Sequence, residues 1–190
     1  MRNVVKTVAS LPVTYTGDLF LAVNDLDFDI VARNFIVLLI ALTTEDSEQA
    51  VQSIIHIWYS ASIRPADARL LTEVICPMVE EVCAKIADRA AGSLQAKTWT
   101  FGKSTLRLVL EKESWTTLLS YFRLPSGLTY QQAHDKRVAV TKAEKQEEPA
   151  RDFCVRHPEH RVCREKYRED GIMLPFGHSR EEFTIPNPYV

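Results

Sequence analysis

The chain has 190 residues, of which 46% are hydrophobic and 25% charged, and its formal net charge is −2. This length suits one hydrophobic core, and the near-neutral charge argues against nucleic acid or an acidic membrane as partner, since neutralising phosphates needs a basic surplus. The longest apolar run, residues 35–42, is far shorter than the roughly 20 residues that a membrane-spanning helix needs.

The cysteine pattern and the N-terminus point to a cytoplasmic protein. Four cysteines, at positions 76, 83, 154 and 163, do not follow the spacing of a secreted disulfide framework. The N-terminus lacks the apolar run of a signal peptide, because Lys6 interrupts it. Residues 1–17 contain no acid, so a mitochondrial presequence is the alternative interpretation.

The N-terminal region predicts a helix, a strand and a second helix, in that order. Residues 2–11 form a helix because apolar residues recur there at helical spacing, namely Val4, Val5, Val8 and Leu11. Residues 19–23 are a continuous apolar run, the pattern of a strand whose two faces are both covered by helices. Residues 29–42 are apolar nearly all round, which predicts a deeply buried helix.

An acid follows the predicted strand directly. Asp25, with Asn24 beside it, stands where nucleotide-binding α/β folds place the acid that binds the hydroxyls of a ribose. Asp25 and Asn24 are therefore our candidate residues for an adenosyl cofactor. The first strand and the glycine-rich turn of such a fold should come before them, so we expect that the chain starts inside this fold. The alternative interpretation is that Asp25, Asp27 and Asp29 favour the N-terminus of the next helix.

The middle of the chain predicts two more helices. Residues 48–60 form a helix whose apolar face consists of Val51, Ile54, Ile55, Trp58 and Tyr59. Residues 66–91 form a longer helix that begins after Pro65, a residue suited to a first turn. Pro77 lies inside this helix and should disrupt it near residues 72–75, whose carbonyls lose a hydrogen-bond donor.

For the two segments that follow, the sequence is compatible with two kinds of secondary structure each. Residues 98–102 form a short strand or a loop, and residues 105–110 alternate like a strand but also suit the start of a helix. Residues 130–140 predict a helix that opens with a capping box, in which Thr129 and Gln132 satisfy each other's backbone N–H groups.

We divide the chain by composition into one domain with a linker. Residues 1–141 make up the α/β domain, and residues 142–150 form a polar linker. Residues 151–190 contain a charged helical segment and an extended, proline-containing tail of the same domain.

The charged segment holds four residues of zinc-binding types at one even spacing, Cys154, His157, His160 and Cys163. Zinc fingers separate two ligand pairs by a long loop, whereas residues three apart on one helix drift around it. We therefore expect no metal site. Should Pro158 break the helix, these four residues are the candidate zinc ligands.

Several motifs along nearly the whole chain belong together: residues 2–7 (RNVVKT), 23–34 (VNDLDFDIVARN), 38–42, 58–60 (WYS), 97–102 (KTWTFG), 107–110 (RLVL), 170–177 (DGIMLPFG) and 186–188 (PNP). They resemble the fungal domain of unknown function numbered 4470, which is sometimes found beside a MYND zinc finger. The family is similar to the N-terminal part of axonemal dynein preassembly factors. This similarity implies a fold like that of class I S-adenosylmethionine-dependent methyltransferases, with Asp25 at the position of their second-strand acid.

The chain departs from the family at both ends. Family members carry a strand and a Gly-Asp dipeptide just before the pair that is Arg2 and Asn3 here, and they usually continue beyond Val190. We therefore expect a shortened, Rossmann-like α/β fold of the class I methyltransferase type with a helix-rich remainder.

The expected function follows from the missing strand and glycine turn. We expect a non-catalytic interaction or scaffold module that binds protein partners and no cofactor, and that self-associates through the exposed edge of the strand at residues 19–23. The alternative is an S-adenosylmethionine-dependent methyltransferase of unknown substrate, with Asp25 on the ribose.

Overall fold

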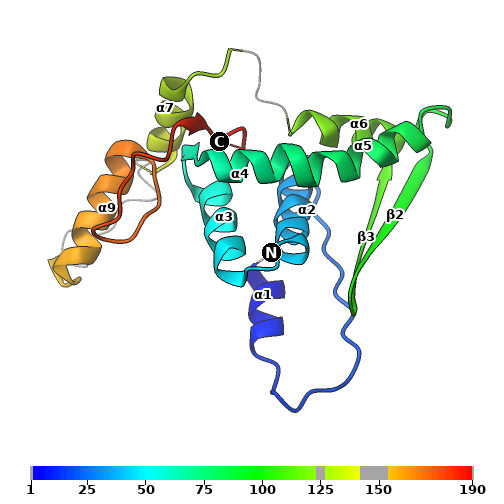
Figure 1. The fold of residues 1–190 in the computed structure, drawn as a ribbon, viewed down its shortest axis with the longest axis horizontal. Helices are drawn as coiled ribbons and strands as arrows, with labels where there is room; N and C mark the ends of the chain where they lie inside the picture. Colours follow the sequence, from blue (N-terminus) through cyan, green and yellow to red (C-terminus); the bar gives the residue numbers. More distant parts are fainter. Residues whose placement is uncertain (1, 123–126, 142–153, 190) are drawn as a thin grey trace.

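The computed structural model describes residues 2–122, 127–141 and 154–189. Its helices are α1 (Arg2–Ala9), α2 (Phe28–Thr43), α3 (Ser47–Tyr59), α4 (Pro65–Arg69), the π-helical η1 (Leu70–Ile75), α5 (Cys76–Lys85), α6 (Lys112–Ser120), α7 (Tyr130–Thr141) and α9 (Pro158–Asp170). Its strands are β1 (Ser62–Ile63), β2 (Leu94–Phe101), β3 (Ser104–Glu111) and β4 (Ile185–Pro186). Figure 1 shows α4, η1 and α5 as one rod, with α2 and α3 beneath it, the β2–β3 hairpin at one end and α7 and α9 at the other.

The core is built around α2, as its composition predicts. Seven of its residues are buried: Ala32, Asn34, Phe35, Ile36, Val37, Leu39 and Ile40. All of them except Asn34 and Val37 belong to one cluster with Leu71, Ile75 and Val79 of the rod and with Trp99 and Trp115 from the hairpin and α6. The burial of so many apolar side chains makes this cluster the main source of stability.

The α-helical pattern of the rod is disrupted near residues 72–75, where we predicted it from the presence of Pro77. Residues 72–75 lie in η1, and the backbone N–H of Cys76 bonds to the carbonyl of Leu71, five residues back instead of four. Proline has no N–H to continue the regular pattern, so a π-helical turn takes up the mismatch. The expected helix over residues 66–91 ends early, at Lys85.

The two open assignments both resolve as strands. Strands β2 and β3 pair antiparallel in a hairpin, with Leu94 opposite Glu111 and Phe101 opposite Ser104. Its turn requires a positive φ, which Gly102 adopts at 58°. The hairpin packs through Trp99, whose ring lies 5.4 Å from that of Phe35.

The expected strand at residues 19–23 is absent, and that prediction is wrong. These residues belong to no sheet, and residues 16–26 make no backbone–backbone hydrogen bond with any described residue. An apolar run becomes a strand only beside another strand, and none lies there. The described residues contain two antiparallel two-stranded sheets, β1–β4 and β2–β3. The Rossmann-like sheet therefore stays a prediction that these residues do not support.

The expected apolar face of α3 is right only in part, because Ile54 and Trp58 are half-buried and Ile54 packs against the core. The helix buries Ala50, Ser53, His56 and Ile57, while Val51, Ile55 and Tyr59 are exposed. The physical reason lies in distant partners, because Ser53 turns inward to bond to Asp67 of α4 and His56 turns inward to pack on Phe183 of the C-terminal tail. Sequence periodicity in the helix alone does not report such partners.

The C-terminal part is helical and then irregular, as expected. Helix α7 opens with the predicted capping box: the N–H of Gln132 donates to Thr129 Oγ1 (3.2 Å) and the N–H of Thr129 to Gln132 Oε1 (3.0 Å). The predicted linker, residues 142–150, lies outside the described residues. Within the described ranges, no helix combines the length and the apolarity that crossing a membrane requires.

Candidate functional site

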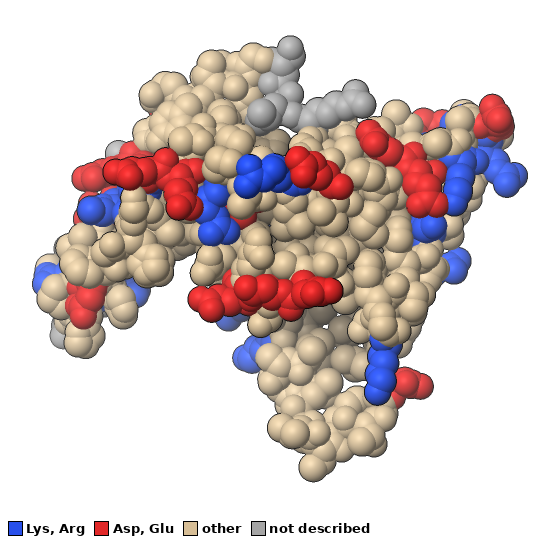
Figure 2. Space-filling view, in the orientation of Figure 1, with Lys and Arg blue, Asp and Glu red and all other residues tan. Residues whose placement is uncertain are grey.

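The N-terminal arm, which we define as residues 2–27, is the most unusual surface of the molecule. None of α1 is buried, and apolar side chains are exposed along the whole arm: Val5, Val8, Val13, Tyr15, Leu19, Phe20, Leu21, Val23 and Leu26. Phe20 and Leu26 are 91% and 103% exposed. In Figures 1 and 2 the arm projects below the body and carries few charges. An exposed apolar patch of this kind marks an interaction surface more often than a passive one.

The predicted cofactor residues lie at the end of the arm and are exposed. Asp25 Oδ1 accepts a hydrogen bond from the N–H of Asp27 (3.2 Å), and Asp27 in turn caps α2 by accepting from the N–H of Asp29 (2.9 Å). This arrangement matches the interpretation of these acids as helix-start residues. Asn24 lies beside Asp25 and is exposed as well.

A third acid at this helix start is held by a tyrosine. The hydroxyl of Tyr121 donates to Asp29 Oδ1. Burial, followed by this hydrogen bond and the charge on Asp29, raises the pKa of Tyr121 to about 12. The contact fastens the start of α2 to the end of α6.

The four candidate zinc ligands do not converge on one point, although the rings of His157 and His160 lie 6.1 Å apart. Cys154 is exposed before α9, His157 precedes Pro158, and His160 and Cys163 follow on the helix. Pro158 starts α9 instead of breaking it. Among the described residues, no group of three or more His, Cys, Asp or Glu side chains is placed to hold a metal ion.

An ion pair that we did not predict from the sequence lies where α3 meets α4. Asp67 is fully buried, and its two carboxylate oxygens accept from Nε and Nη2 of Arg64, both at 2.9 Å. Ser53 donates to the same carboxylate at 2.7 Å, and Arg64 Nη1 donates to Gln52 at 3.0 Å. Burial alone would raise the pKa of Asp67, but the bonds from Arg64 and Ser53 outweigh it and lower that pKa.

A second polar group joins the C-terminal tail, residues 171–189, to the end of α3. His56 is buried, and its ring packs edge-on against Phe183 at 4.7 Å. Burial, and to a lesser degree the charge on Arg64, lowers the pKa of His56 to about 4 against the opposing effect of Asp67. Asn187, also buried, donates to the carbonyls that end α3.

These polar residues include types used in catalysis, but their contacts hold the C-terminal tail against the end of α3. His56 Nδ1 lies 3.5 Å from Ser60 Oγ, and Ser60 Oγ already accepts the N–H of Met173 at 3.0 Å. Both side chains are buried, so substrate has no access to them. For the ion pair, the signal that the sequence offered was the three-residue spacing of Arg64 and Asp67 directly after β1, which is typical of a contact at a helix N-terminus. No local pattern pointed to Asn187.

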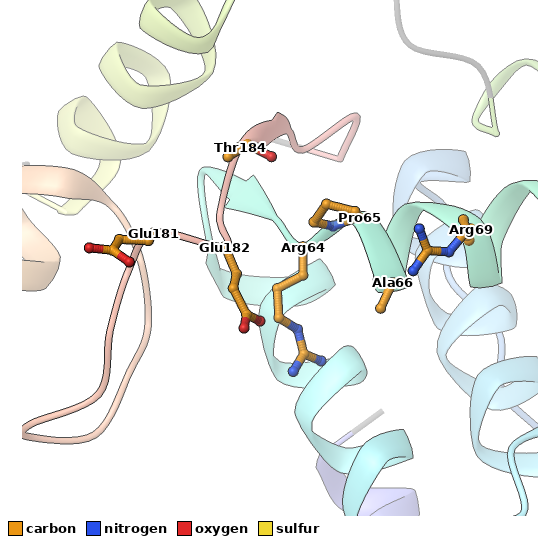
Figure 3. Close-up of a pocket in the computed structure, with 7 residues that line it drawn as sticks. All are labelled: Arg64, Pro65, Ala66, Arg69, Glu181, Glu182 and Thr184. Carbon is orange, nitrogen blue, oxygen red and sulfur yellow. The ribbon is translucent and has the colours of Figure 1, made fainter.

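An open hollow of about 360 Å³ lies beside the ion pair. Figure 3 shows that it is lined by Arg64, Pro65, Ala66 and Arg69 on one side and by Glu181, Glu182 and Thr184 on the other. The side chain of Glu182 extends toward Arg64, whose pKa it helps to raise after the larger effect of the Asp67 hydrogen bond. The opposing charges of its two walls compensate each other.

Comparison with known proteins identifies one family over the first third of the chain. Residues 1–63 match the model of DUF4470, a domain of unknown function. The predicted resemblance is thereby confirmed for the arm, α2, α3 and β1, while the fungal source and the relation to preassembly factors stay predictions. No curated protein and no solved structure matches the chain.

Proposed function

We propose that this protein is a non-catalytic interaction module of the cytoplasm whose docking surface is the N-terminal arm. The observation that carries the proposal is the row of exposed apolar side chains from Val5 to Leu26. Water contact with this row costs free energy in proportion to its area, roughly 25 cal/mol per Å² of apolar surface. A partner that covers the arm recovers this free energy.

The backbone of the arm supports the same proposal. Residues 16–26 leave their N–H and C=O groups without a backbone partner among the described residues. Unpaired main-chain groups next to apolar side chains form a template on which another segment can pair as a strand. The arm thus offers main-chain hydrogen bonds and apolar contacts to one partner together.

The polar groups of the body favour binding over catalysis. Ser53, Asp67, His56 and Ser60 are buried and engaged with one another or with the tail. A catalytic group must instead reach a substrate within hydrogen-bond distance. All four cysteines are thiols, in keeping with the reducing compartment that we propose.

Sedimentation velocity over a range of protein concentrations tests the proposal. We expect the wild type to self-associate and the Phe20→Ser/Leu26→Ser variant to sediment as a monomer, because serine removes the two most exposed large arm residues between Tyr15 and Phe28. Phe176→Ser, which changes an exposed aromatic in the tail, is the matched control and should associate like the wild type. A wild type that stays monomeric at high concentration would contradict the proposal.

The second candidate function is that of an S-adenosylmethionine-dependent methyltransferase. The observation in its favour is the exposed carboxylate of Asp25, with Asn24 beside it, directly before α2 in the region that matches the family. Calorimetry with S-adenosylmethionine decides the matter. Binding heat from the wild type that disappears in Asp25→Ala supports the methyltransferase, and equal or absent heat from both proteins eliminates it.

A further inference from the structure

We infer that the partner of the interaction module is a second copy of this chain, and that each copy docks its helix α1 on the exposed face of α3 of the other. This inference rests on the proposed function and names both surfaces of the contact. Two exposed apolar surfaces of matching length and opposite charge carry it.

Helix α1 is built to bind something that it does not contact here. It has only eight residues and buries none of them, and isolated helices of that length are marginal in water. Val5 and Val8 are exposed on it. Its charges are all positive, since Arg2 and Lys6 are its only charged residues and the first acid of the chain is Asp18.

Helix α3 presents the complementary surface. Val51, Ile55 and Tyr59 are spaced four apart, so they form one ridge along the helix, and all three are exposed. The C-terminal end of the ridge is held in place, because the ring of Tyr59 stacks on Trp58 at 5.4 Å and Arg33 lies over Trp58 at 5.2 Å. The ridge is therefore preformed.

The two surfaces also match in charge. Glu45, Asp46 and Glu48 lie at the N-terminal end of α3, and the sequence has no Lys or Arg between Arg33 and Arg64. Figure 2 shows an acidic band across the middle of the molecule, at the level where Figure 1 places the junction of α2 and α3. Parallel packing of α1 on α3 brings the cations of α1 to this acidic end.

The lengths of the two surfaces agree as well. Eight residues of helix rise about 12 Å, and the ridge from Val51 to Tyr59 also extends over about 12 Å. With Arg2 and Lys6 at the acidic end, Val5 and Val8 lie against Val51 and Ile55. Each partner thus contributes an apolar ridge and one sign of charge.

The geometry points to a second copy as the source of α1. In its own molecule α1 lies below the junction of α2 and α3, off the end of α3 (Figure 1), and leaves the ridge uncovered. Residues 10–27 connect α1 to the body and can span roughly 60 Å when extended. Reciprocal exchange of α1 closes a two-fold dimer in which each copy gives one helix and one ridge.

Disulfide trapping between two marked copies tests this contact. One copy carries Val5→Cys and the other, with a different tag, carries Val51→Cys, both in a Cys154→Ser/Cys163→Ser background. We expect a disulfide that joins the two tags under mild oxidation. A control copy with Val74→Cys, another exposed valine, should not join to Val5→Cys. A single chain with both cysteines that forms only an internal disulfide would overturn the inference in favour of its own α1.

Charge reversal gives a second readout by sedimentation. Arg2→Glu/Lys6→Glu should weaken the dimer at least about tenfold, and Glu45→Lys/Glu48→Lys should do the same, because each juxtaposes like charges. A mixture of the two variants should associate again as a heterodimer, because both contacts of the exchange then join opposite charges: the acidic α1 meets the basic end of α3, and the basic α1 meets the acidic end. Association that depends on Phe20 and Leu26 but ignores these charges and gives no joined tags would overturn this inference and leave the interaction module standing, whereas absence of any association overturns the module itself.

Discussion

Asn187 and Ile57 are 130 positions apart in the chain, yet the side-chain Nδ2 of Asn187 donates to the carbonyl oxygen of Ile57 at 2.9 Å. The same amide donates to the carbonyl of Ser60 at 2.7 Å. The last carbonyls of a helix have no partner within it. Asn187 thus satisfies two of the carbonyls at the end of α3, while Arg137 and Tyr167 donate to those of Trp58 (3.5 Å) and Tyr59 (2.8 Å).

Asn187→Ala should destabilise the protein by about 2–4 kcal/mol, because it leaves two buried carbonyls without a donor and each unsatisfied group costs about 1–3 kcal/mol. Urea unfolding followed by circular dichroism measures this difference. Asn3→Ala, on the exposed face of α1, is the control and should change the free energy of unfolding little. Equal stability of the two variants would show that Asn187 does not cap α3.

Gly171→Ala should cost more than Gly102→Ala, and the difference isolates a steric contact. Both glycines have positive φ, 69° and 58°, so alanine at either position is strained by roughly 1–2 kcal/mol. A Cβ at Gly171 would lie 2.8 Å from that of Ala61, whereas one at Gly102 meets nothing within 4 Å. We expect an additional loss of about 1–3 kcal/mol at Gly171. Matching midpoints of urea unfolding in the two variants would argue against close packing of the tail on Ala61.

Asp67→Ala should destabilise the protein by about 3–5 kcal/mol, because it leaves the partly buried guanidinium of Arg64 without its counter-charge and the buried hydroxyl of Ser53 without its acceptor. The double variant Arg64→Met/Asp67→Leu should recover much of this loss, since an apolar pair replaces the ion pair in the same volume. Glu81→Gln, which breaks the exposed pair with Lys85, should have little effect. A double variant no more stable than Asp67→Ala would show that the pair also holds the α3–α4 geometry through its hydrogen bonds.

Acid should weaken the fold between pH 6.5 and about 4 through His56. The pKa of His56 is about 4 in the folded chain against 6.5 in the unfolded one. In this window the unfolded chain binds a proton that the folded chain does not, so stability is complete above pH 6.5 and falls as the pH is lowered. The loss should reach about 2–3 kcal/mol near pH 4. Because the pKa of Asp67 is lowered from 3.8, the stability that this carboxylate contributes is lost only at more acidic pH, below the window of His56.

Unfolding midpoints at a series of pH values measure this effect, with His56→Gln as the comparison. The variant is less stable at pH 7 but should show a flatter profile between pH 6.5 and 4. If the wild type and the variant decline in parallel over this range, His56 is not the titrating group.

The features that the sequence predicted are those with local causes. The burial of α2 follows from its nearly unbroken apolar composition, and the capping box of Thr129 and Gln132 from two residues three positions apart. The disruption of the long helix near residues 72–75 follows from the missing N–H of Pro77, although its π-helical form, η1, was not predicted. Each of these signals acts over a few residues, so it can be read before the rest of the fold is known.

The features that escaped prediction depend on distant partners. The buried face of α3 is set by Asp67 and Phe183, which lie outside that helix. Residues 19–23 have strand-like composition, but a strand also needs a neighbour that composition does not report. For the same reason, the ion pair of Arg64 and Asp67 and the role of Asn187 became apparent only in the folded molecule.

The position of Asn187 near the end of the sequence also delays the completion of α3 during translation. A ribosome adds about 5–20 residues per second, so Asn187 is made on the order of 10 s after Ile57. Until then the end of α3 has formed without its capping side chain, and strand β1 waits for β4 as its partner. A nascent chain of this protein should therefore spend those seconds as a partly open intermediate, which is the state that chaperones bind and proteases cut.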